Sequence, residues 1–112
     1  MTTFDKTAIA MPGQAWKQPN EVLDLAVDFV ERLTSATITV GSVTAVELPD
    51  EADASAAIIE TSPAPFVQPL SKAIQFRLKA GEAGKDYKVT VIANGADGQV
   101  AEYDLVLHIL EY

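Results

Sequence analysis

The sequence predicts an all-β protein, an antiparallel β-sandwich, from two observations. The first is a period of two in three runs between Ile74 and Leu110, where every second side chain is apolar. The second is the turn signals between these runs: Gly81 and Gly84 bracket one turn, and Asn94-Gly95 marks the next. About seven short strands with a turn signal roughly every ten residues are typical of a sandwich.

The expected strands begin after an N-terminal segment. Residues 21–30 alternate as a strand does, although 20–33 also carries a helical apolar stripe with Asn20 as a cap. The β context of the remaining chain favours the strand. Residues 36–48 are rich in Thr and Val and break at Gly41, which indicates two short strands or one bulged strand. The expected strands are 21–30, 36–41, 43–48, 54–61, 72–79, 86–93 and 100–110.

Two features refine this fold. Tyr87 follows a tight turn at the start of a core strand, which is the position of an immunoglobulin tyrosine corner, so we expect an immunoglobulin-like sandwich. Residues 62–69 contain three prolines, which exclude regular structure there. The resulting stiff loop carries Phe66 and Val67, either as a contact patch or as a cap on the end of the sandwich.

The N-terminal segment has a different pattern. Its apolar residues, Phe4, Ile9, Met11 and Trp16, recur without a period that would bury them in a helix or strand of their own. Tryptophan is a preferred anchor in protein interfaces. We therefore expect two parts: an extended docking arm over residues 1–19, and the sandwich domain over residues 20–112.

Composition excludes several classes of protein. The formal net charge of −8 is opposite to the basic face that nucleic-acid binding needs. There is no cysteine, so no disulfide or thiolate site is available. No apolar run reaches the roughly 18 residues of a membrane span, and the N-terminus lacks a signal-peptide pattern. We expect a soluble protein that begins at or near Met1 and binds neither membrane nor nucleic acid.

The charges are unevenly distributed along the chain. Residues 21–60 hold nine acids and one base, whereas residues 72–88 hold five bases and two acids. One interpretation is a pair of solvated faces. The other is that the basic region, Lys79 and Lys85 in particular, meets an acidic region of a neighbouring subunit and orients the contact.

A search for catalytic chemistry finds little. His108 is the only histidine and has no cysteine or nucleophile-elbow serine to act with, which favours a structural or surface role. The acidic residues between Glu47 and Asp53 lack the spacing of a calcium loop, so a solvated loop is favoured over a cation site. We predict no enzyme activity, no catalytic residues, no metal and no cofactor.

Two motifs carry a resemblance to a known family. They are the opening Lys17-Gln-Pro-Asn-Glu-Val-Leu-Asp and the later Ala80-Gly-Glu-Ala-Gly-Lys-Asp-Tyr. In their order along residues 17–110, they make the chain resemble small immunoglobulin-like virion proteins of tailed bacteriophages, of the fibre–tail adaptor, head–tail or capsid decoration type. The resemblance implies a structural protein of the virion, assembled in the host cytoplasm, that contacts major capsid, tail or fibre proteins or other copies of itself.

The alternative is a soluble immunoglobulin-like module that binds protein or carbohydrate outside any virion, since this fold serves many functions. A carbohydrate-binding module is expected to align Trp and Tyr on one face. Here the single Trp16 lies in the N-terminal segment. The sequence thus favours the virion protein, with Phe4, Ile9, Met11, Trp16, Phe66, Val67, Lys79 and Lys85 as the expected partner-binding residues.

Overall fold

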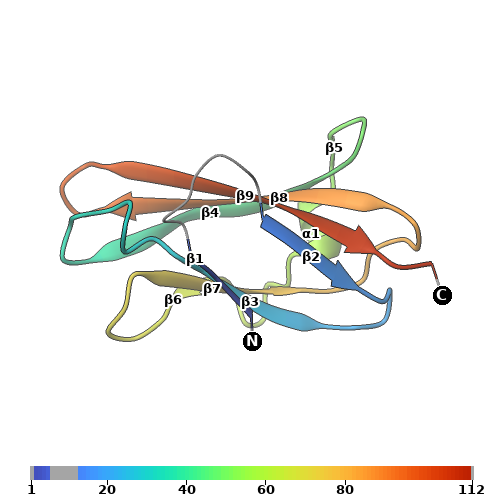
Figure 1. Cartoon of the computed structure of the whole chain (residues 1–112), viewed down its shortest axis with the longest axis horizontal. Coiled ribbons are helices and arrows are strands. Elements are labelled where there is room, and N and C mark those ends of the chain that lie inside the picture. The colour runs from blue at the N-terminus through green and yellow to red at the C-terminus, as the bar shows by residue number, and fades with distance from the viewer. Residues whose placement is uncertain (1, 6–12, 112) are drawn as a thin grey trace.

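The computed structural model describes residues 2–5 and 13–111, and its fold is all-β. Two sheets form the layers of a sandwich (Figure 1). The strand order is β1-β3-β7-β6 in one sheet and β2-β9-β8-β4-β5 in the other. The expected all-β sandwich is confirmed.

The four-stranded sheet contains β1 (Thr2–Asp5), β3 (Leu23–Asp28), β6 (Phe66–Val67) and β7 (Ala73–Leu78). The five-stranded sheet contains β2 (Gly13–Lys17), β4 (Ile38–Glu47), β5 (Ala52–Asp53), β8 (Asp86–Gly95) and β9 (Val100–Ile109). One helical turn, α1 (Ser55–Ile58), lies between β5 and β6. No helix in these described segments is long and apolar enough to cross a membrane.

The core lies between the sheets and follows directly from the alternation. On β8 and β9 every second residue is buried, and the antiparallel register places Val89 opposite Leu105 and Tyr87 opposite Leu107. On the facing sheet, Leu25 lies opposite Phe76 and is equally buried. Removing such side chains from water is worth about 25 cal/mol per Å² of apolar surface, so the two inner faces hold the layers together.

The strand interpretation of residues 20–33 is confirmed, because β3 occupies 23–28 and Leu25 and Val27 face the core. Residues 36–48 contain one strand, β4 (Ile38–Glu47), with a register shift between Val40 and Ser42. The extra residue is Gly41, where a Cβ would lie 2.9 Å from the Ile92 side chain and carbonyl oxygen. The bulged-strand alternative is therefore the correct one.

The expected strand over residues 54–61 is wrong. Residues 55–58 form α1 instead, and only Ile59 makes an isolated bridge, to Leu78. The stretch from Ala54 to Ala57 is rich in alanine, the strongest helix former, and the Asp53 carboxylate accepts a hydrogen bond from the Ser55 N–H. Local propensity thus outweighs the apolar pair Ile58-Ile59 that suggested a strand.

The proline-rich loop is not entirely irregular, contrary to expectation. Phe66 and Val67 form the short strand β6, paired with Gln75 and Ile74 of β7. Pro65 and Pro69 flank the strand and limit it to two residues, because a proline has no N–H to donate to a ladder.

The described parts of the N-terminal segment pair with strands of the same chain. β1 runs parallel to β3, and β2 runs parallel to β9. The expected arm therefore has partners within the chain at residues 2–5 and 13–17. Ile9 and Met11 lie outside the described residues. The role of residues 1–19 in docking stays a prediction.

Tyr87 is buried, with 6% of its surface exposed, and its hydroxyl accepts a hydrogen bond from the Glu82 N–H at 3.1 Å. This bond ties the turn between β7 and β8 to the start of β8. The contact is the one expected of a tyrosine corner, in which the side chain bonds the backbone a few residues upstream.

Candidate functional site

The candidate site is a row of three interacting side chains on the surface, across neighbouring strands of the five-stranded sheet. Trp16 of β2 lies opposite His108 of β9, and His108 lies opposite Asp86 of β8. All three are on the outer face, because the alternate residues Ala15, Leu107 and Tyr87 are buried in the core. Strand register thus aligns an indole, an imidazole and a carboxylate side by side.

The row is tightly held. The Trp16 and His108 rings are stacked, with centroids 5.2 Å apart and planes at 23°. His108 Nδ1 lies 2.8 Å from Asp86 Oδ1, and Nε2 lies 2.5 Å from Gln14 Oε1. Both ring nitrogens therefore have a partner, which fixes the imidazole plane under the indole. Trp16 nonetheless keeps 58% of its surface exposed. We call Gln14, Trp16, Asp86 and His108 the tryptophan platform.

Strand β2 is anchored at both ends, and this sets which way Trp16 points. At its start, the Gly13 N–H donates a hydrogen bond to the Tyr103 hydroxyl. At its end, the Lys17 side chain is completely buried, and its ammonium donates to the carbonyl oxygens of Gln18 (2.7 Å), Pro19 (3.2 Å) and Ala80. With Lys17 turned inward, its neighbour Trp16 must turn outward.

The buried ammonium also joins two parts of the chain. Gln18 and Pro19 belong to the turn after β2, whereas Ala80 follows β7 of the other sheet. Burial lowers the pKa of Lys17 from its usual value, and the Glu21 carboxylate partly offsets that shift. Glu21 itself accepts a hydrogen bond from the Gln18 N–H at 2.6 Å. The motif that opens at Lys17 is thus a turn built around one buried cation.

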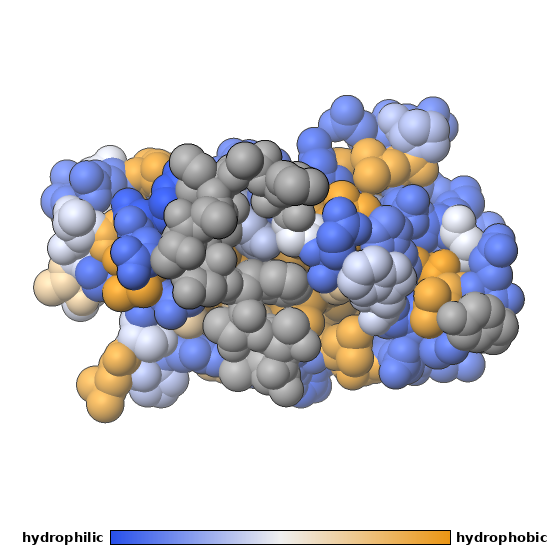
Figure 2. Space-filling model, in the orientation of Figure 1, coloured by the Kyte–Doolittle hydropathy of each residue, from blue (hydrophilic) through white to orange (hydrophobic). Residues whose placement is uncertain are grey.

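The surroundings of the platform are mixed in polarity. On the same outer face, the Thr90 hydroxyl donates to Asp104 at 2.8 Å, and Lys88 lies 3.5 Å from Glu51. Outside the grey region of Figure 2, hydrophilic residues separate small apolar areas on the side of the sandwich that the figure shows. The exposed indole therefore lies on an outer face of mixed polarity.

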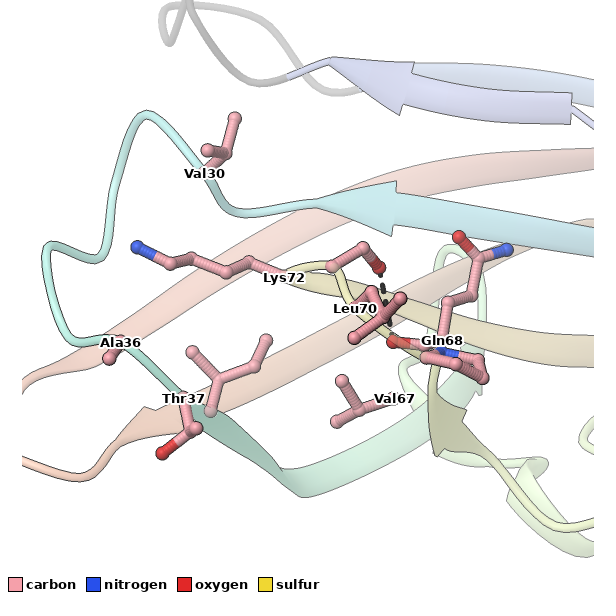
Figure 3. Close-up of a pocket in the computed structure, with 10 residues that line it drawn as sticks. Val30, Ala36, Thr37, Val67, Gln68, Leu70 and Lys72 are labelled. Atoms are coloured by element: carbon pink, nitrogen blue, oxygen red, sulfur yellow. Dashed lines mark hydrogen bonds between the residues drawn. The ribbon is translucent and has the colours of Figure 1, made fainter.

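The predicted residues Phe66 and Val67 lie elsewhere, on β6. Phe66 is 38% exposed and shares the outer face of the four-stranded sheet with its partner Gln75. Val67 lines a cleft of about 660 Å³ between the loop after β3 and the turn before β7 (Figure 3). Leu70, which is fully exposed, lies in the same turn. Phe66 therefore lies outside the cleft that Val67 and Leu70 line, and all three residues lie apart from the tryptophan platform.

The predicted lysines are already paired within the chain. Lys79 lies 3.5 Å from Glu60, and Lys85 pairs with Glu47 and, at 3.4 Å, with Glu82. Glu47 and Glu60 belong to the acidic region 21–60, so the pairing considered between neighbouring subunits occurs inside one molecule. Phe4 lies in β1, and Ile9 and Met11 lie outside the described residues. A role of all these residues in binding a partner stays a prediction.

Three residues of the platform were not predicted as partner-binding: Gln14, Asp86 and His108. Alternation in residues 13–17 could have placed Gln14 beside Trp16, but the inward lysine breaks the apolar pattern. His108 and Asp86 join the row only through the register of β2, β9 and β8. That register is not visible in the sequence.

No three side chains of His, Cys, Asp or Glu gather into a possible metal site among the residues that the structure describes. In the acidic loop, Glu47 and Glu51 pair with lysines, and Asp53 accepts the Ser55 N–H. These carboxylates are thus engaged in intrachain contacts.

Together, the sandwich and the platform define a small all-β protein with an exposed indole held in place on its outer face. The family model of the podophage GP4 fiber-tail adaptor protein gp77 matches residues 17–108, and the chain belongs to this family. It is therefore a structural protein of a phage virion, and the resemblance to virion proteins is confirmed. The match begins at the buried Lys17 and includes Tyr87 and His108. A comparison with curated proteins found no match.

Proposed function

We propose that the chain is a non-enzymatic adaptor that connects fibre and tail and binds one of its virion partners through the tryptophan platform. Family membership supports the adaptor role. The observation that carries the platform assignment is Trp16, which is 58% exposed yet held in one orientation by stacking on His108. Ordering a side chain on binding costs free energy, and this indole is ordered beforehand.

The energetics favour Trp16 as the central anchor. Tryptophan is the residue type most enriched among interface hot spots, and such residues sit within a ring of weaker contacts that exclude water. Gln14, Asp86 and His108 can provide such a ring around the indole. The N-terminal segment 1–19, which delivers Trp16, belongs to the docking surface in this proposal.

We also propose that the β-sandwich is of the immunoglobulin-like type. With the two-residue strand β5 left aside, the strand orders β1-β3-β7-β6 and β2-β9-β8-β4 are those expected of an immunoglobulin domain with its first strand divided between the two sheets. The contact between Tyr87 and Glu82 supports the same assignment. In this arrangement the platform lies on the sheet that contains the last strand of the chain.

The test is replacement of Trp16 by alanine. We expect Trp16→Ala to fold normally, since the indole lies outside the core, and to weaken binding to purified tails lacking this protein by at least about 30-fold, the loss typical of a hot spot. Val22→Ala is the matched control, because Val22 is 56% exposed and lies in the turn after β2. Unchanged affinity of Trp16→Ala would place the docking surface elsewhere.

The position of the protein in purified particles separates the adaptor role from the alternatives. Density at the junction of fibre and tail supports the proposal. Density over the capsid shell assigns the chain to capsid decoration instead. Absence from the particle favours a soluble binding module.

A further inference from the structure

Strand β4 carries an unpaired edge on the side of the sandwich opposite β1 and β2. β4 pairs with β8 along its length, but on its other side β5 covers only Val46 and Glu47. Next to them, the Ala45 N–H donates to the Ser55 hydroxyl at 2.9 Å, and the Ala45 carbonyl accepts from the Ala54 N–H at 2.9 Å. Ala45 is thus satisfied by the start of α1 rather than by a strand.

The direction of the Ala45 groups determines that of Val43. Backbone groups two residues apart on a strand point the same way, so the N–H and C=O of Val43 also face away from β8. On the far side of the bulge, the Thr37 carbonyl accepts a hydrogen bond from the Ala96 N–H after β8. Backbone direction alternates along a strand, so the N–H and C=O of Val40, three residues later, point the opposite way, toward the open edge. In the described part of the chain, no residue hydrogen-bonds the edge-facing groups of Val40 and Val43.

This edge lacks the usual protection against strand addition. Natural sheet edges are blunted by charge, proline or shortness. On the same side of the sandwich, β5 and β6 are each two residues long, and prolines flank β6. Residues 38–46, in contrast, contain no charged residue and no proline. The bulge at Gly41 interrupts the edge without covering it.

An apolar groove runs beside the same edge. It has a volume of about 430 Å³, and its apolar lining comes from Val40 and Val43 of β4, Ala56 and Ile59 at α1, and Pro65. β6 does not close the gap by pairing, because its ladder is with β7. Unpaired backbone groups next to an apolar groove are the two elements that peptide recognition by strand addition needs.

We propose that β4 accepts an extended, uncharged segment of another virion protein as an additional strand, with its apolar side chains in this groove. This inference rests on the proposed adaptor function and names a second docking surface for it. The adaptor family indicates other virion proteins as partners. A second copy would offer the same β4 edge, which the bulge at Gly41 interrupts and which β5 covers at Val46 and Glu47. We therefore assign the added strand to a different protein rather than to a second copy.

The first test is hydrogen exchange with residue resolution, comparing the isolated full-length chain with the chain in purified virions. We expect exchange of the Val43 amide to slow in the virion by on the order of tenfold or more, because it gains a partner. Thr44 is the internal control, since its amide faces β8 and is protected in both states.

The outcomes separate this inference from the proposed function. If the chain is present in virions and the Val43 amide exchanges as in the isolated protein, the added strand is excluded while the adaptor role stands. If the chain is absent from virions, the adaptor role itself fails. Slowing of Val43 exchange in the isolated chain as its concentration rises would assign the strand to a second copy and overturn our choice of partner.

The second test fills the groove. Ala56→Trp introduces a large side chain into the groove that Val43 also lines, whereas Ala57→Trp is the matched control, because Ala57 is also exposed and does not line the groove. We expect Ala56→Trp to lower the copy number of the chain in virions at least tenfold and Ala57→Trp to leave it unchanged, with both proteins unfolding near the wild-type temperature. Normal incorporation of Ala56→Trp would overturn the inference. If Ala56→Trp does not fold, the hydrogen-exchange comparison decides, because it uses the wild-type protein.

Discussion

At the scale of single residues, Lys17 sets the geometry of the tryptophan platform. A lysine is almost never fully buried unless its charge is paired, yet here three carbonyl oxygens satisfy the ammonium and the aliphatic stem fills the end of the core. From the sequence, Trp16 was predicted as an anchor, but Lys17 was not predicted as a core residue. Its inward position depends on carbonyls contributed from both sides of the sandwich, and no local pattern encodes that.

We expect Lys17→Met to destabilise the fold by about 1–3 kcal/mol, because it keeps the apolar stem but leaves buried carbonyl oxygens without a donor. The free energy of unfolding in urea measures the loss. Lys88→Met serves as the control: the Lys88 side chain is 36% exposed, and surface substitutions usually stay within about 0.5 kcal/mol. Equal stability of the two variants would show that the hydrogen bonds from Lys17 to the three carbonyl oxygens contribute nothing to the free energy of unfolding.

At the scale of elements, the strands with strict alternation could be predicted and the short elements could not. β3, β7 and β9 lie within the expected ranges because one face of each packs on the core. β8 extends beyond its expected end at residue 93 to Gly95, so the predicted turn residues Asn94 and Gly95 belong to the strand and the turn follows them. α1 and β6 were missed, since four and two residues give no measurable period. Of the four platform residues, only Trp16 was predicted. Its partners are brought together by strand register rather than by nearness in sequence.

The bulge in β4 offers an element-scale prediction. Gly41→Ala places a methyl group 2.9 Å from both Ile92 Cγ2 and the Ile92 carbonyl oxygen. We expect a loss of about 1–3 kcal/mol in unfolding free energy, typical of overpacking, measured by thermal or urea denaturation. Thr39→Ala, at an exposed position of the same strand, should change stability by no more than about 0.5 kcal/mol. A neutral Gly41→Ala would mean that the bulge relaxes without cost.

At the scale of the whole molecule, folding places the acidic region of the sequence next to the basic region. Acids of residues 21–60 pair with bases of residues 72–88: Asp24 with Arg77, Glu60 with Lys79, Glu47 with Lys85, and Glu51 with Lys88. Exposed pairs of this kind are individually weak. Together they link the two charged regions, so charge segregation in the sequence is no guide to charge segregation on the surface.

Acid stability should report this pairing. The hydrogen bonds from the Arg77 guanidinium lower the pKa of Asp24 below its usual value of 3.8. A carboxyl whose pKa is lower in the folded state stabilises the fold above its unfolded pKa, and this contribution is lost as the pH falls through the folded value. We therefore expect Asp24→Asn to be less stable than wild type at pH 7, with the difference shrinking below about pH 3.8.

Urea unfolding at pH 7 and at several values below pH 4 measures the effect. Glu31→Gln is the control, because Glu31 is exposed and forms no ion pair with any residue in the described ranges. A difference between Asp24→Asn and wild type that is independent of pH would attribute it to packing instead of charge.

The parallel pairing of β2 with β9 has a mechanical consequence. The chain enters β2 at Gly13, opposite Leu105, and leaves β9 beyond Ile109, which lies opposite Lys17. A tensile load between these two points pulls the strands along their lengths in opposite directions. The ladder is then loaded in shear, so its hydrogen bonds share the force and do not open one after another. If the protein is placed under tension, this pair of strands resists the load, and the hydrogen bonds of the buried Lys17 ammonium hold the end of β2 to the other sheet.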